Sequence, residues 1–153
     1  MKKVTEANFE LKAVKILEKG VYAKFNGTQA LGNDSNTTNK GEFTNKDQPH
    51  PDFVKAFELL LPIVAYDEGA GDISKYTIKG LSFKNDSTVK ISHMKEIESG
   101  ETSRNSGYIS FDNEEFEYRK ELKAACEKIK HEAYQYFINN KRLQLALAVE
   151  DAA

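Results

Sequence analysis

The feature that most limits the fold of this chain is a long segment near its C-terminal end, in which apolar residues recur at spacings of three, four or six. The members of this apolar stripe are Phe116, Leu122, Cys126, Ile129, Ala133, Tyr136 and Phe137. The spacing predicts an amphipathic helix that needs an apolar surface to pack against. Asp112 or Asn113 is expected to cap this helix, and Glu114, Glu115 and Glu117 place negative charge in its first turns, which suits the helix dipole.

Segments with alternating apolar and polar residues predict the sheet that the stripe requires. Residues 8–25 are interpreted as a β-hairpin that turns at Gly20, with a one-residue phase slip near Ala13 of the kind that a β-bulge produces. Residues 75–97 predict a second hairpin, with its own slip at Gly80 and a turn at residues 85–87. Residues 108–111 predict a fifth short strand.

The remaining segments complete the predicted architecture. Residues 26–50 carry few apolar anchors and are expected to be a long polar loop. A central helix is predicted after Pro51, and Pro62 is expected to kink it or to end it. The sequence therefore predicts one α+β domain over residues 1–142, an antiparallel sheet of about five strands with the two helices packed on one face. Residues 143–153 are expected to be a tail or a helix extension.

Charge and composition exclude several classes of protein. The chain has 153 residues, and its 22 Lys and Arg against 24 Asp and Glu give a net charge of −2. This balance disfavours a dedicated binder of nucleic acid, which usually carries a basic excess. The single cysteine forbids an intrachain disulfide and favours the reducing cytoplasm. The sequence has no apolar run long enough for a membrane span and no export signal, so no membrane association is expected.

Motifs for catalysis or cofactor binding are not found in the sequence. His131-Glu132 resembles the start of a zinc protease motif, but Gln135 stands where the second histidine is needed. Cys126 lies on the apolar stripe, where a thiol mostly acts as a small hydrophobic group. The glycines at 69 and 71 follow a predicted helix, which is the reverse of a phosphate-binding loop. We therefore expect no enzyme, no cofactor and no metal.

The central hairpin is the best candidate for a binding site. Between Lys75 and Lys95 there are five lysines and one acidic residue, Asp86. Lysines and hydroxyls on one sheet face can hold a phosphate, and an arginine beside an aromatic ring can clamp a base. The candidate ligand-binding residues are Lys79, Lys84, Lys90, Arg104 and Tyr108. The simpler interpretation is the solvated face of an antiparallel sheet.

One resemblance concerns the order of several short segments. They are His50-Pro51-Asp52-Phe53 leading to Leu61-Pro62, the hairpin from Thr77 to Ser92, Ile109-Ser110-Phe111-Asp112 before Glu115-Phe116-Glu117-Tyr118, and Glu132-Ala133-Tyr134-Gln135-Tyr136-Phe137 before Lys141-Arg142. This order over residues 50–142 resembles small early proteins of tailed bacteriophages. The resemblance implies a viral origin, the cytoplasm of the host cell as location, and a role in handling nucleic acid or in countering host defence.

Three hypotheses for function follow. The first is a non-enzymatic protein that sequesters a small anionic ligand such as a nucleotide signal, with a homo-oligomer able to form the pocket between chains through the last helix or the tail. The second is an accessory protein that stacks single-stranded nucleic acid on Tyr76, Tyr108 and Phe111, which the net charge disfavours. The third is a protein that docks on a host enzyme and inhibits it.

Overall fold

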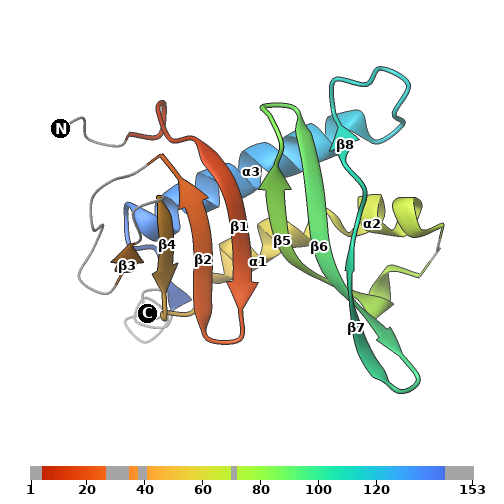
Figure 1. The fold of residues 1–153 in the computed structure, drawn as a ribbon, viewed down its shortest axis with the longest axis horizontal. Coiled ribbons are helices and arrows are strands. Elements are labelled where there is room, and N and C mark those ends of the chain that lie inside the picture. The colour runs from red at the N-terminus through yellow and green to blue at the C-terminus, as the bar shows by residue number, and fades with distance from the viewer. Residues whose placement is uncertain (1–4, 27–34, 38–40, 70–71, 144–153) are drawn as a thin grey trace, which may run out of the picture.

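The protein has an α+β fold in which helices cover one face of an antiparallel sheet, as the sequence predicts. The computed structural model describes residues 5–26, 35–37, 41–69 and 72–143. Within these residues the sheet has eight strands, in the order β3-β4-β2-β1-β5-β6-β7, with the short strand β8 paired to β6. Figure 1 shows the helices together behind the sheet, so that its other face, here called the helix-free face, is not covered by any helix of the described part.

The first hairpin consists of β1 (Leu11–Leu17) and β2 (Gly20–Phe25), and it confirms the predicted turn. Gly20 has a positive φ of 108°, and a Cβ at this position would lie 1.9 Å from the Asn45 carbonyl oxygen. A side chain is therefore excluded there by the backbone conformation and by space. The predicted bulge is present as well, because the pairing shifts between Leu11 and Ala13.

The prediction of a polar loop over residues 26–50 is wrong for part of that range. It contains β3 (Ser35–Thr37) and β4 (Glu42–Asn45), and β4 pairs with β2. Phe43 is fully buried, and its ring stacks on Phe25 with the ring centroids 4.1 Å apart. A single aromatic side chain thus anchors a strand of four residues, which composition alone does not indicate.

The second hairpin consists of β5 (Tyr76–Phe83) and β6 (Thr88–Ile97), preceded by a 3-10 turn at Ile73–Lys75. Its turn at residues 85–87 and its phase slip are confirmed, since the pairing with β6 shifts between Ile78 and Gly80. β5 also pairs with β1, over only three residue pairs. This short contact joins the two hairpins into one sheet.

Two further strands follow β6. β7 (Gly100–Asn105) pairs along β6 and was not predicted, because all of its residues are polar or glycine and nearly all are exposed. β8 (Ile109–Ser110) is the predicted fifth strand, reduced to two residues opposite Thr88 and Val89. The sheet therefore has more strands than the sequence predicts.

The central helix is divided, as Pro62 led us to expect. α1 (Pro51–Glu58) begins after His50, whose Nδ1 accepts a hydrogen bond of 3.0 Å from the Asp52 backbone N–H. α2 (Leu61–Glu68) has Pro62 in its first turn, where the missing N–H costs no helical hydrogen bond. The helix ends at Gly69 in the left-handed conformation.

The last helix, α3 (Arg119–Phe137), begins later than predicted. Residues 112–118 form turns before it, in which the Asn113 side chain accepts a hydrogen bond from the Glu115 backbone N–H. Phe116 consequently lies outside the helix, while the rest of the apolar stripe, from Leu122 to Phe137, is buried against the sheet. The predicted tail or helix extension over residues 143–153 falls on residues 144–153, which lie outside the described part, except for Leu143. Within the described part, none of the helices combines the length and the apolar character that crossing a membrane requires.

Candidate functional site: the helix-free face of the sheet

The strand pairing places a row of polar residues across the helix-free face. Val14 and Leu81 are buried under the helices, so their neighbours Lys15 and Gly80, which are paired with each other, face the other way. The same register pairs Lys15 with Tyr22, and Gly80 with Ser92. This first row, from β4 to β7, consists of Thr44, Tyr22, Lys15, Gly80, Ser92 and Asn105.

A second row runs beside the first. Ala13 pairs with Ser82, and Ser82 pairs with Lys90 on β6. Tyr108, just before β8, lies next to Lys90. The Lys84 and Lys90 ammonium nitrogens lie 5.0 Å and 5.6 Å from the centroid of the Tyr108 ring, which is within the range of cation–π contacts. Tyr108 is 56% exposed, so this residue is accessible from solvent.

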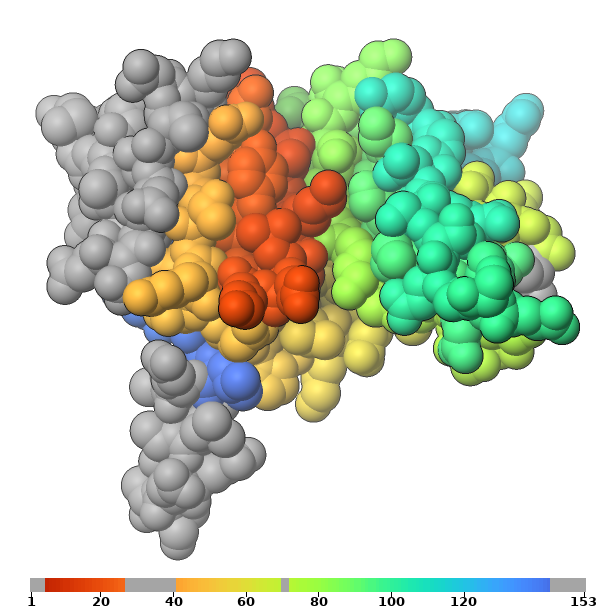
Figure 2. All heavy atoms as spheres, turned by 60° about the horizontal axis from the view of Figure 1, so that its bottom comes forward, coloured from red at the N-terminus to blue at the C-terminus, as the bar shows by residue number. Residues whose placement is uncertain are grey.

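The two rows border a recess of about 510 Å³ on the helix-free face. Gly80 leaves the middle of the first row without a side chain. Two lysines, Lys15 and Lys90, line the recess together with Ser82, Ser92 and Asn105, and the described lining residues include no carboxylate. Figure 2 shows this region obliquely, with the red N-terminal strands meeting the green strands β5 to β7. The recess therefore combines positive charge with hydroxyl and amide groups.

The groups around the recess are ordered by hydrogen bonds within the sheet. The Ser92 hydroxyl donates to Asn105 Oδ1 over 2.8 Å, and the Tyr22 hydroxyl donates to Glu42 Oε1 over 3.0 Å. Burial, together with the hydrogen bond and the charge of Glu42, raises the pKa of Tyr22, which keeps the phenol neutral. Lys15, Lys84 and Lys90 form no salt bridge with any residue in the described ranges. Their charges are thus available to a ligand.

The structure brings three of the five predicted site residues together, namely Lys84, Lys90 and Tyr108. Lys79 is the extra residue of the bulge in β5 and belongs to neither row. Arg104 is paired with His93, which is buried on the helix-covered face, so Arg104 lies on the opposite side of the sheet from Tyr108. Lys79 and Arg104 therefore do not join this cluster.

Arg104 instead takes part in a charged cluster at the end of α2. Its guanidinium donates to Glu68 over 2.7 Å, and His93 Nε2 lies 3.1 Å from the other oxygen of the same carboxylate. Burial raises the pKa of Glu68, but the hydrogen bond with His93 and the charge of Arg104 outweigh it and hold this pKa below its ordinary value. This cluster fastens α2 to β6 and β7.

Sequence reasoning missed Lys15 and Asn105. Ser82 and Ser92 were placed with Lys84 and Lys90 on the non-core face of the second hairpin but were not named among the candidate ligand-binding residues. Lys15 belongs to the first hairpin, and nothing in the sequence states that β1 pairs with β5. Strand alternation was the available signal for Lys15, Ser82 and Ser92, because it marks them as residues that face away from the core. It gives no such signal for Asn105, because β7 is polar on both faces. The pairing that unites the four residues is a tertiary contact.

The cysteine and the histidines considered for catalysis or metal binding have structural contacts instead. Burial, with a smaller contribution from Glu127, raises the pKa of the Cys126 thiol to about 12, so the thiol stays neutral. His131 Nδ1 contacts the Glu6 carboxylate, and His50 caps α1. Within the described ranges, His, Cys, Asp and Glu side chains do not gather in threes as metal ligands would.

Comparison with known proteins gives no match: no family model, no curated protein and no solved structure is similar to this chain.

Proposed function

We propose that the protein is a non-enzymatic binding protein that sequesters a small anionic ligand, such as a nucleotide signal, in the recess of the helix-free face. One observation carries this proposal. Lys15 and Lys90, which form no salt bridge with the described residues, line a recess with several hydroxyl and amide groups, beside the exposed Tyr108, and the described lining residues include no carboxylate. Ligand pockets commonly measure about 300–1,000 Å³, and the recess lies within that range.

The chemistry of the recess suits an anion with an aromatic part. Ammonium groups and hydroxyls can donate to phosphate oxygens, and charge-assisted hydrogen bonds are the stronger kind. The exposed ring of Tyr108 can stack on a base, and this contact contributes about 1–3 kcal/mol per base. The ligand needs only these few groups, so a net charge of −2 for the whole chain is no obstacle.

The resemblance to early proteins of tailed bacteriophages supplies a setting for this proposal. Removing a nucleotide signal from the cytoplasm of the host cell would counter a defence that depends on it. The recess is lined by residues of a single chain. The predicted association of several copies is consequently not needed for binding, and it stays a separate prediction.

A small ligand is favoured here over single-stranded nucleic acid. Of the three aromatic residues expected to stack on a strand, Tyr76 is 5% exposed and Phe111 is half-buried beside the core, which leaves Tyr108. One stacking residue with three nearby lysines matches a ligand of one or two nucleotides better than a long strand.

Ligand screening with matched variants tests the proposal. Thermal shift and calorimetry would be measured with ADP-ribose, cyclic dinucleotides and a single-stranded oligonucleotide. At least one small nucleotide is expected to raise the melting temperature. Lys90→Gln, Lys15→Gln and Tyr108→Ala are each expected to weaken its binding about tenfold or more, which corresponds to about 1.4 kcal/mol. Lys55→Gln, at an exposed position on α1, is the control and should bind normally.

Two results would overturn the proposal. The first is that no small nucleotide in the panel binds. The second is binding that is equally strong in the Lys90→Gln and Lys55→Gln variants. Preferential binding of the oligonucleotide over every small nucleotide would support the accessory-protein hypothesis instead.

A further inference from the structure

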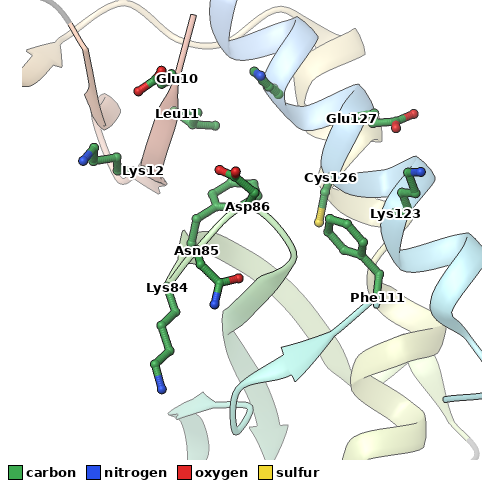
Figure 3. A pocket seen from close by; sticks show the side chains of 12 residues that line it. Glu10, Leu11, Lys12, Lys84, Asn85, Asp86, Phe111, Lys123, Cys126 and Glu127 are labelled. Atoms are coloured by element: carbon green, nitrogen blue, oxygen red, sulfur yellow. The ribbon is translucent and has the colours of Figure 1, made fainter. Parts of the chain in front are cut away.

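A second cavity lies on the helix-covered side of the sheet, under the turn between β5 and β6. Its volume is about 410 Å³, and four elements line it with an apolar side chain each. Leu11 comes from β1, Phe83 from β5, Phe111 from the segment after β8, and Cys126 from α3. Figure 3 shows the Cys126 sulfur and the Phe111 ring next to each other in this space.

The volume of this cavity, which opens to solvent, falls within the range of about 300–1,000 Å³ that small-molecule sites commonly have. Cys126 is 3% exposed and its thiol is neutral, so it acts as an apolar part of the floor. The floor is suited to an aromatic ring or a short aliphatic chain.

The walls of the cavity are held in place by local hydrogen bonds. The Phe111 backbone N–H donates to the Ser87 carbonyl oxygen over 3.0 Å. Asn85 Oδ1 accepts from the backbone N–H groups of Ser87 and Thr88, over 3.0 Å and 2.9 Å. These hydrogen bonds join the turn to Phe111, and the opening opposite α3 is present without a ligand. Such preorganisation lowers the entropic cost of binding.

The helical wall contributes positive charge. Lys123, Cys126 and Lys130 are spaced by three and four residues, so they lie on one face of α3, and all three line the cavity. Neither lysine forms a salt bridge with a residue of the described part. Figure 3 shows the Glu127 carboxylate turned to the opposite side of α3 from Cys126, and the Lys84 side chain pointing away from the cavity. Glu10, Asp86 and Glu127 also line the cavity, so its rim carries both signs of charge, and Lys123 and Lys130 are the cationic part on the helical side.

We propose that this cavity is a second binding site, distinct from the recess, for a small molecule that has an aromatic or aliphatic body and one anionic group. The body lies between Phe111 and Cys126, and the anionic group, a carboxylate, sulfonate or phosphate, lies against Lys123 and Lys130. The two sites share no lining residue, because the recess lies on the helix-free face and this cavity on the helix-covered side of the second hairpin.

Two naphthalene probes test the proposal. The first is 1-anilinonaphthalene-8-sulfonate, which carries an anion and fluoresces in apolar surroundings. The second is N-phenyl-1-naphthylamine, which has the same rings without the sulfonate. This cavity is expected to bind one equivalent of the anionic probe, in addition to any bound in the recess, about tenfold more tightly than the neutral one, a difference of about 1.4 kcal/mol.

Matched variants locate the bound probe. Lys123→Gln combined with Lys130→Gln should weaken binding of the anionic probe about tenfold and leave the neutral probe unaffected. Cys126→Met, which fills part of the cavity with a flexible side chain, should weaken both probes. Lys90→Gln and Tyr108→Ala alter only the recess and should change neither. Circular dichroism verifies that each variant is folded.

The proposal is overturned if the anionic probe does not bind, if both probes bind equally well, or if binding survives unchanged in the Lys123→Gln, Lys130→Gln and Cys126→Met variants. It is also overturned if Lys90→Gln or Tyr108→Ala abolishes binding of the probe.

Discussion

The two ends of the sheet are held to the helices by different forces. At the end that contains β2 and β4, the Phe25 ring stacks on Phe43 and lies 5.5 Å from the ring of Phe137 on α3, and all three side chains are buried. At the other end, β7 has almost no buried residue, and Arg104 connects it to α2 through Glu68.

This difference determines how the stability of each end depends on pH and salt. Burial of apolar surface depends little on pH or salt, and it contributes about 25 cal/mol per Å². An ion pair depends on the protonation of its carboxylate and is weakened by salt where it is exposed. The β2–β4 end should therefore set the stability of the whole fold, while the β7 end should open separately.

Phe43→Ala should have the largest effect on stability. It removes a fully buried ring from the stack with Phe25, and such a change costs about 3–5 kcal/mol of unfolding free energy. Urea denaturation measures this loss. Tyr108→Ala, which removes an exposed ring, should stay within about 0.5 kcal/mol of the parent protein. A loss below about 1 kcal/mol for Phe43→Ala would contradict the assigned role of β4.

Gly80→Ala acts where the two ends are joined and should have the next largest effect. The new Cβ would lie 2.8 Å from the Val14 carbonyl oxygen, so the short β1–β5 pairing has to shift, at a cost of about 1–3 kcal/mol. It also intrudes on the recess and should weaken ligand binding there. Gly107→Ala is the matched control, because a Cβ at that position meets no atom within 4 Å. Equal stability of the two variants would refute the proposed close packing.

Glu68→Gln should loosen the β7 end selectively. It removes the negative charge that Arg104 and the buried His93 share. The free energy of opening the β7 end should therefore fall by about 1–2 kcal/mol. Hydrogen exchange is the suitable measurement, since amides of β7 should exchange faster while those of β1 and β2 keep their protection. Uniformly faster exchange over the whole sheet would show that the two ends do not open independently.

The pH dependence of β7 follows from the same carboxylate. The pKa of Glu68 is lower in the folded protein than its ordinary value of 4.5. Its stabilising contribution is therefore complete above about pH 4.5 and is lost as the pH falls through the folded pKa. The protection of β7 in the parent protein should approach that of Glu68→Gln on acidification below that range. A difference between the two proteins that stays constant down to pH 3 would contradict this linkage.

Lys90→Gln should have the smallest effect on stability, within about 0.5 kcal/mol, because Lys90 forms no salt bridge with the described residues. Its effect should appear in ligand affinity alone. A large loss of stability in this variant would show that the lysine is a structural residue of the sheet.

Much of the secondary structure could be predicted because it depends on local patterns. The phase slips at Ala13 and Gly80 correspond to real bulges, and Pro62 marks the start of a second helical segment. β7 was missed because its residues are polar on both faces, which is typical of an exposed edge ribbon and of a loop alike. α3 was predicted too long because Phe116 continues the apolar stripe in the sequence. In the structure Phe116 lies in a turn before the helix, and its side chain packs against the core from there.

The candidate site was predictable only in part, because strand alternation is a local pattern whereas the register between strands is not. Lys84 and Lys90 belong to one hairpin, so strand alternation alone puts them on one face, and Tyr108 follows from the short strand beside it. The position of Arg104 depends on the register of β7 with β6, which no sequence pattern revealed.

The sequence by itself determined the α+β class, the two hairpins and the buried stripe of α3, because each is set by a periodicity within a continuous segment. Only the tertiary structure decided that β1 pairs with β5 and that α3 passes beneath the end of the second hairpin. Those contacts join residues far apart in the chain, and they depend on how the apolar faces fit together. The recess above Gly80 and the cavity beside Cys126 both arise there, where separate elements meet without filling the space between them.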